Sequence, residues 1–186
     1  MFMTKNASAI SILLFAFAAA SFSCQLNHLS EPQHASATTA EQRVIRQQIA
    51  EMIHQALKAS TINLKEGVVA TTVPLLSPED YAKVRQFGDA ATPVLCEYLA
   101  SKNYFEQLLA IRLLDTIGTN TAKDVLDSFA EKAELPATRM YALEFVAIAQ
   151  RTRDIEILEK IAAADPNINV RTKAIDVIQR YNLKRN

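Results

Sequence analysis

Apolar residues recur every three or four positions from residue 77 to residue 182, which is the spacing of one buried face of an α-helix. Helix start and stop signals divide this pattern into segments. Ser77 provides a cap, and Gly88 and Gly118 are typical of helix ends. Asn103, followed by Glu106, resembles a cap and its partner. We predict helices over about 78–87, 89–101, 104–117, 121–132, 136–150, 153–164 and 168–182.

The pattern repeats with a period of 32 residues. The matching segments are 106–118 (EQLLAIRLLDTIG), 138–150 (TRMYALEFVAIAQ) and 170–182 (VRTKAIDVIQRYN). Ala110, Ala142 and Ala174 share one position of this alignment, and apolar residues surround them. A fixed period of this length indicates stacked helical hairpins, each burying its apolar face on its neighbours. A small side chain at the shared position lets paired helices approach closely.

The last copy resembles a known repeat. Residues 165–178 read DPNINVRTKAIDVI, which is similar to the HEAT-like repeat of the type first described in phycobilisome lyases. The hallmark of that family is Asp, then Val-Arg, then Ala, and it matches Asp165, Val170, Arg171 and Ala174. The resemblance covers about 90–182. It implies an all-α fold in which the repeats form a short right-handed α-α superhelix.

The earlier copies depart from the family pattern. The middle copy keeps Arg139 but has Ala133 at the position of the Asp, and the first copy has Gln107 at the position of the Arg. In the family, the Asp and Arg bridge adjacent repeats. Asp165 and Arg171 are therefore interpreted as structural rather than catalytic.

Residues 39–76 precede the repeats as a lone helix and a short extended segment. Apolar residues share one face of the helix, which begins near Thr39: Ile45, Ile49, Met52, Ile53 and Ala56. His54 falls on the polar face. Residues 61–76 look extended by composition, and are either a small hairpin or an irregular segment over a core edge. We expect either this part of the chain or a partner to cover the first end of the stack.

Residues 1–23 have the pattern of a secretory signal peptide. Lys5 precedes an apolar run of twelve residues, Ala9–Ala20, which is short of the roughly 20 needed to span a bilayer. Cleavage after Ala20 fits ordinary signal peptidase, whereas Ser23-Cys24 resembles a bacterial lipobox with Cys24 as the lipidated residue. Both sites stay open. Residues 24–38 lack periodicity and are interpreted as a flexible tether.

Composition excludes several classes of protein. Acidic and basic residues balance at 20 each, which argues against a nucleic-acid binder. Three scattered glycines cannot form a phosphate-binding loop, and two cysteines with three histidines cannot form a zinc finger. We predict no cofactor and no metal. Cys96 lies in an apolar helical stretch and is interpreted as a buried thiol; if Cys24 is not lipidated, a disulfide between the two is the alternative.

The sequence contains no recognisable catalytic arrangement, so we expect a non-enzymatic scaffold that binds a protein or peptide partner. The second helix of each repeat carries carboxylates at outward positions, among which Asp154 also falls. Four of them form two pairs that align at the 32-residue period, Asp124 with Glu156 and Asp127 with Glu159, and these four are the candidate partner-binding residues. They form either an acidic stripe for a basic ligand or an ordinary solvated face.

Two other functions stay open. One is a structural or assembly subunit of an envelope complex, and the other is a lyase-like enzyme that handles a chromophore, as implied by the family resemblance. In each case we expect export, either to the periplasm or as a membrane-anchored lipoprotein of a bacterial envelope. Membrane contact is then expected only through a lipid on Cys24. The sequence leaves the oligomeric state open.

Overall fold

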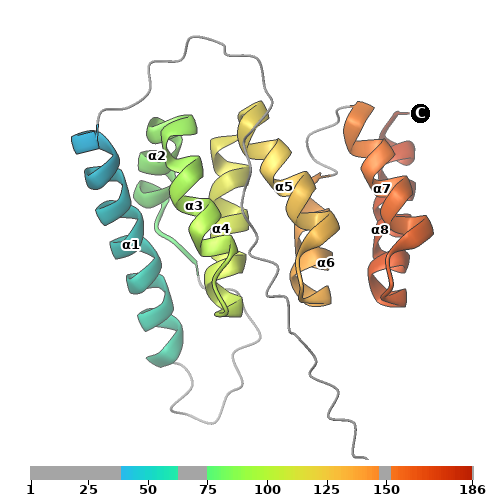
Figure 1. Ribbon diagram of the computed structural model, residues 1–186, viewed down its shortest axis with the longest axis horizontal. Coiled ribbons are helices and arrows are strands. Elements are labelled where there is room, and N and C mark those ends of the chain that lie inside the picture. Colours follow the sequence, from blue (N-terminus) through green and yellow to red (C-terminus); the bar gives the residue numbers. More distant parts are fainter. Residues whose placement is uncertain (1–38, 63–74, 147–151, 186) are drawn as a thin grey trace, which may run out of the picture.

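The computed structural model describes residues 39–62, 75–146 and 152–185 (Figure 1). These ranges are helical, without a strand. The helices are α1 (Thr39–Ile62), α2 (Pro78–Phe87), the 3-10 turn η2 (Gly88–Ala91), α3 (Thr92–Leu99), α4 (Tyr104–Ile117), α5 (Asn120–Lys132), α6 (Pro136–Val146), α7 (Thr152–Ala164) and α8 (Ile168–Arg185). The predicted signal peptide, the tether and Cys24 lie outside the described residues.

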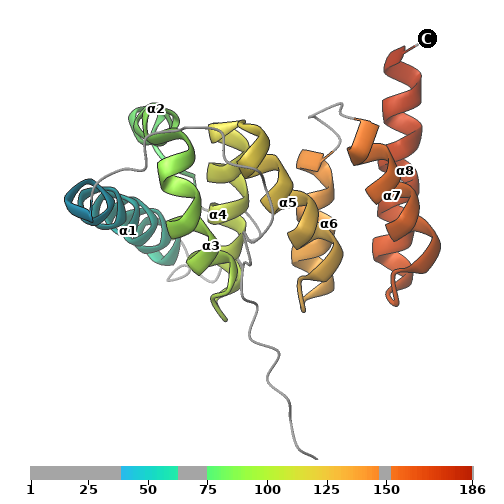
Figure 2. The ribbon, with the colours of Figure 1, turned by 45° about the horizontal axis from the view of Figure 1, so that its top comes forward.

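The helices from α2 onward pack in two layers. Consecutive helices form the pairs α3–α4, α5–α6 and α7–α8. The first layer contains α3, α5 and α7, and the second contains α2, α4, α6 and α8, with each helix contacting the next one of its own layer. Figures 1 and 2 show the pairs following one another from α1 at one end of the molecule to α7 and α8 at the other.

The helix starts keep the predicted period. Helices α4, α6 and α8 begin at residues 104, 136 and 168, and η2, α5 and α7 begin at residues 88, 120 and 152. Ala110, Ala142 and Ala174 are therefore at the same position in α4, α6 and α8, and each has 0% of its surface exposed. Their burial lets each of these helices lie close to its neighbours.

Local capping explains where the helices begin and end. Ser77 and Asp80 form a capping box at the start of α2, in which the Ser77 hydroxyl accepts from the Asp80 backbone N–H at 3.1 Å. Gly88 and Gly118 adopt φ values of 53° and 69°, which few other residues tolerate, and they end α2 and α4. The predicted stop signals are confirmed.

Two local predictions are wrong. Asn103 caps α4, but its backbone N–H donates to the Ser101 hydroxyl, and the predicted capping partner Glu106 hydrogen-bonds that same hydroxyl. Thr61 and Ile62 continue helix α1 instead of being extended, although their composition favours a strand. The rest of the predicted extended segment, 63–74, lies outside the described residues.

Helix α1 packs against the first end of the stack. It contacts α2, η2, α3 and α4, and all five residues of its predicted apolar face are buried. His54 is exposed, as predicted. The Cys96 side chain of α3 is buried, which confirms the prediction of a buried thiol.

Candidate functional site

One polar contact recurs in all three copies of the repeat. The side chains of Gln107, Arg139 and Arg171 occupy equivalent positions near the start of α4, α6 and α8. Their nitrogens donate to the carbonyl oxygens of Ser101, Ala133 and Asp165, respectively, at 2.8, 2.6 and 2.6 Å. These carbonyls lie just after α3, α5 and α7, where backbone acceptors lack helical partners. Gln107, although it has no guanidinium, thus makes the same kind of contact as the two arginines.

Arg139 and Asp165 join two successive helix pairs. The Nε and Nη2 atoms of Arg139 donate to the two carboxylate oxygens of Asp165 at 2.8 and 2.9 Å, and both side chains are buried. Burial by itself would raise the pKa of Asp165. Hydrogen bonds from Arg139 and the Asn167 backbone, with the positive charge of Arg139, hold this pKa below its usual value. The geometry is that of a fixed structural link rather than of a proton donor.

The four candidate carboxylates do not form one exposed row. Asp127 is only 1% exposed, and Asp154 on α7 is buried to the same extent, so the prediction that both point outward is wrong. Asp127 is covered because α7 packs on α5. Asp154 repeats the position of Ala122 on α5, which is also fully buried. Arg153 of α7 reaches both carboxylates of α5, at 3.3 Å from Asp124 and 4.0 Å from Asp127.

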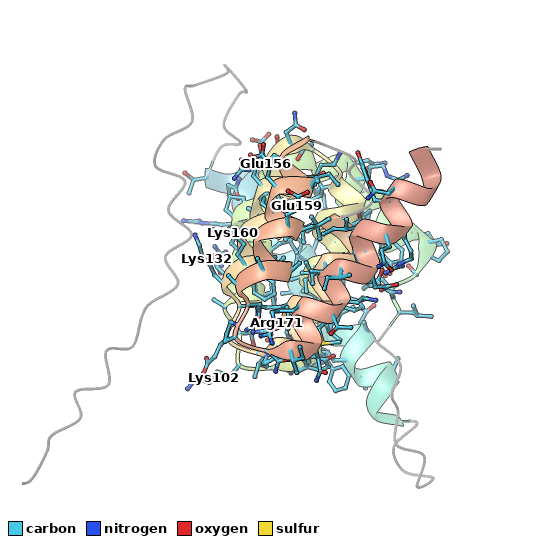
Figure 3. All side chains as sticks on the ribbon, turned by 90° about the vertical axis from the view of Figure 1, so that its right-hand side faces the viewer. Lys102, Lys132, Glu156, Glu159, Lys160 and Arg171 are labelled. Carbon is cyan, nitrogen blue, oxygen red and sulfur yellow. The ribbon has the colours of Figure 1, made fainter. Side chains whose placement is uncertain are left out.

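Glu156 and Glu159 have a different environment. Both are exposed on α7, and within the described part of the chain neither side chain forms an ion pair. Their neighbour Lys160 instead bonds Glu131 of α5 at 3.1 Å. Figure 3, which looks onto the end formed by α7 and α8, shows Glu156 and Glu159 on that end. The predicted stripe therefore divides into an inner pair bound by Arg153 and an outer pair facing solvent.

Charged side chains of the second layer are also paired with one another. Glu144 of α6 bonds Arg180 of α8 at 3.1 Å and also bonds Lys173 of α8. Burial opposes ionisation of Glu144, but these two cations bring its pKa below the usual value. On α8, Arg180 also pairs with Asp176 at 2.8 Å. These ion pairs fix α8 against α6.

A shallow polar hollow of about 290 Å³ lies where α1, α3 and α4 meet. Its lining includes Tyr98 and the Arg46–Glu97 ion pair, in which Arg46 Nη2 donates to Glu97 Oε1 at 2.7 Å. The Glu97 carboxylate raises the pKa of Arg46, and burial raises the pKa of Tyr98. Arg46 and Glu97 are already paired with each other, and this ion pair links α1 to α3.

Residues 39–62, 75–146 and 152–185 contain no group of three or more His, Cys, Asp or Glu side chains arranged to hold a metal ion. Over the same ranges, no helix combines the length and the apolar character needed to cross a bilayer. Comparison with protein families, with curated proteins and with solved structures finds no match for the chain.

Proposed function

We propose that the chain is a non-enzymatic helical-repeat scaffold, of the HEAT-like α-solenoid kind, that binds a protein partner in a bacterial envelope. The observation that carries this proposal is the recurrence of one side chain-to-carbonyl contact at Gln107, Arg139 and Arg171. A contact that returns with each repeat is expected of a solenoid, in which every unit touches only its neighbours. Solenoids commonly use their extended surfaces for binding.

The binding surface we propose is the outer side of α7 with its two carboxylates. Inner carboxylates at equivalent positions are bound by Arg153, whereas Glu156 and Glu159 are exposed. Because a guanidinium already fills this register one repeat earlier, a basic side chain of a partner is the chemistry that fits. Asp124 and Asp127 then hold α7 in place rather than contacting the partner.

The test is chemical cross-linking in extracts of the native envelope, followed by mass identification. We expect that reversing both charges, Glu156→Lys with Glu159→Lys, reduces capture of the partner at least tenfold. The matched control is Glu51→Lys with Glu134→Lys, which makes the same change of net charge at exposed positions outside α7. Equal capture by the two variants would contradict the proposed surface.

The runner-up function is a structural subunit of an envelope assembly. It is favoured by apolar exposure on the last helix, where Ile168 and Ile175 are 59% and 46% exposed. Exposed isoleucines on one helix are common in surfaces that assemble with other chains. A permanent complex that co-purifies at fixed stoichiometry supports this function, and reversible capture supports the scaffold.

A further inference from the structure

The end of the molecule formed by α7 and α8 is open at positions that the inner repeats bury. Ile175 of α8 is equivalent to Ile111 of α4 and Leu143 of α6, which are both 0% exposed, yet Ile175 is 46% exposed. Ile168 lies two helical turns earlier on α8 and is 59% exposed, at a position that is also exposed on α4, where Tyr104 is 36% exposed. Terminal repeats of a soluble solenoid normally carry a polar outer face, so this end has the character of an interface.

The two ends of the stack differ. Helix α1 packs across the first end and contacts four successive elements, α2, η2, α3 and α4. Helix α8 contacts α6 and α7, which lie on one side of it. Within the described residues, the outer side of the last pair therefore has no counterpart of α1.

The charged groups at this end repeat, one repeat further on, the groups that form ion pairs between successive helix pairs inside the stack. Inside, Arg153 binds the acids of α5, and Arg139 binds Asp165 through Nε and Nη2. At the end, Glu156 and Glu159 repeat the positions of the α5 acids and have no ion pair among the described residues.

Arg171 repeats the position of Arg139. It uses Nη1 on the carbonyl oxygen of Asp165, and no carboxylate of the described residues is ion-paired with it. An arginine has five N–H donors, so Nε and Nη2 of Arg171 are available for a carboxylate from another molecule. The ion pairs formed at the equivalent inner positions indicate that a partner of this end would supply both a guanidinium and a carboxylate.

This end itself has that combination. In Figure 3, Glu156 and Glu159 lie in the upper part of the end and Arg171 lies in the lower part. A two-fold axis that lies across the end, between the carboxylates and the arginine, turns the upper part of one copy onto the lower part of the other. Each Arg171 then faces the carboxylates of the other copy, and the exposed isoleucines of the two α8 helices come together.

We propose that a second copy of this chain covers the α7–α8 end, forming a two-fold symmetric dimer. This inference rests on the proposed function, because it names the partner of the same surface. Opposite charges that meet twice across a two-fold axis give the interface its register, and burial of the isoleucines stabilises it.

Sedimentation equilibrium of the full chain, in density-matched detergent, tests the dimer. We expect a reversible dimer for the natural sequence, and at least tenfold weaker association for Glu159→Arg and for Arg171→Glu, each measured alone. Mixing these two variants should restore association, because each reversed side chain then meets an opposite charge in the other copy. Glu51→Arg, on α1, is the control and should dimerise normally. A monomer at concentrations up to about 100 μM would overturn the proposal.

A second variant protects the test against misfolding, since Arg171 also closes the end of α7. Ile175→Lys places a charge in the centre of the proposed interface on a side chain that is already half exposed. We expect this variant to be folded by circular dichroism and monomeric by sedimentation equilibrium. Val44→Lys on α1, where Val44 is 54% exposed, should stay dimeric. If Ile175→Lys stays dimeric, the α7–α8 interface is wrong. If the natural chain is monomeric and still captures an envelope protein through Glu156 and Glu159, the dimer falls and the scaffold function stands.

Discussion

At the scale of single residues, the Arg139–Asp165 pair has the strongest structural role that the contacts indicate. Both side chains are buried, both carboxylate oxygens are bound, and Arg139 also reaches the carbonyl oxygen of Ala133. The pair therefore connects the end of α5, the start of α6 and the loop before α8. Removing one partner would leave the other charge buried without compensation, which is far costlier than losing a surface ion pair.

We predict that Asp165→Asn lowers the free energy of unfolding by about 3 kcal/mol at neutral pH. Urea denaturation followed by circular dichroism measures this change. The control is Glu131→Gln, which removes an ion pair with the exposed Lys160 and should cost less than about 1 kcal/mol. Equal losses in the two variants would contradict the structural role of the buried pair.

The same carboxylate gives stability a pH dependence. Because the pKa of Asp165 is lower in the folded chain than its ordinary value of about 4, its ionised form stabilises the fold above that pH. This stabilisation is lost as the pH falls through the folded pKa, since protonation removes the charge that Arg139 binds. We expect the difference in unfolding free energy between the natural chain and Asp165→Asn to shrink steadily below about pH 4, measured by urea denaturation at a series of pH values. A constant difference would contradict a lowered pKa of Asp165 in the folded chain.

At the scale of helices, the size of the side chain at one shared position limits how closely the helices pack. Ala110, Ala142 and Ala174 are fully buried at the same residue of α4, α6 and α8. A larger side chain at this position would have to push apart helices that contact each other closely. The alanines thus set the separation of the helices, whereas the surrounding leucines and isoleucines supply most of the buried apolar area.

We predict that Ala142→Leu lowers the free energy of unfolding by about 2 kcal/mol through overpacking. Ala82→Leu, at an exposed position of α2, makes the same chemical change without crowding and should alter stability by less than about 0.5 kcal/mol. Chemical denaturation of both variants gives the comparison. If the two substitutions have the same effect, the shared alanine position does not control helix packing.

At the scale of the whole molecule, the two ends of the helix stack differ in the side chains that they expose. One end of the stack is covered by α1, and the other exposes two isoleucines, two carboxylates and an arginine. The proposed export places these groups in the envelope, where a lipid on Cys24 would keep the domain at a membrane surface.

Intact-mass measurement of the protein expressed as the full chain in a bacterial host tests export. We expect the leader to be removed, leaving either Ser21 at the amino terminus or a lipidated Cys24. In the second case, Cys24→Ala should abolish labelling by palmitate. A mature protein that keeps residues 1–20 would contradict the signal peptide.

Sequence alone was sufficient for the helices and their period, because capping and 3.6-residue periodicity act over a few neighbouring residues. The apolar face of α1, the glycine stops and the 32-residue register of α4, α6 and α8 are all of this kind. The helical state of Thr61 and Ile62 was missed because composition is a weak guide at a helix end.

Only the tertiary structure decided which charged residues face solvent. Asp127 and Glu159 occupy the same register on α5 and α7, yet Asp127 is buried and Glu159 is exposed. Likewise, Asp165 pairs with Arg139 from the preceding helix pair, although Arg171 is much closer in sequence. Periodicity assigns a residue to a face of its helix, but burial depends on whether another helix packs over that face. Helix α7 covers the face of α5 that carries Asp127, whereas no described helix covers the face of α7 that carries Glu159.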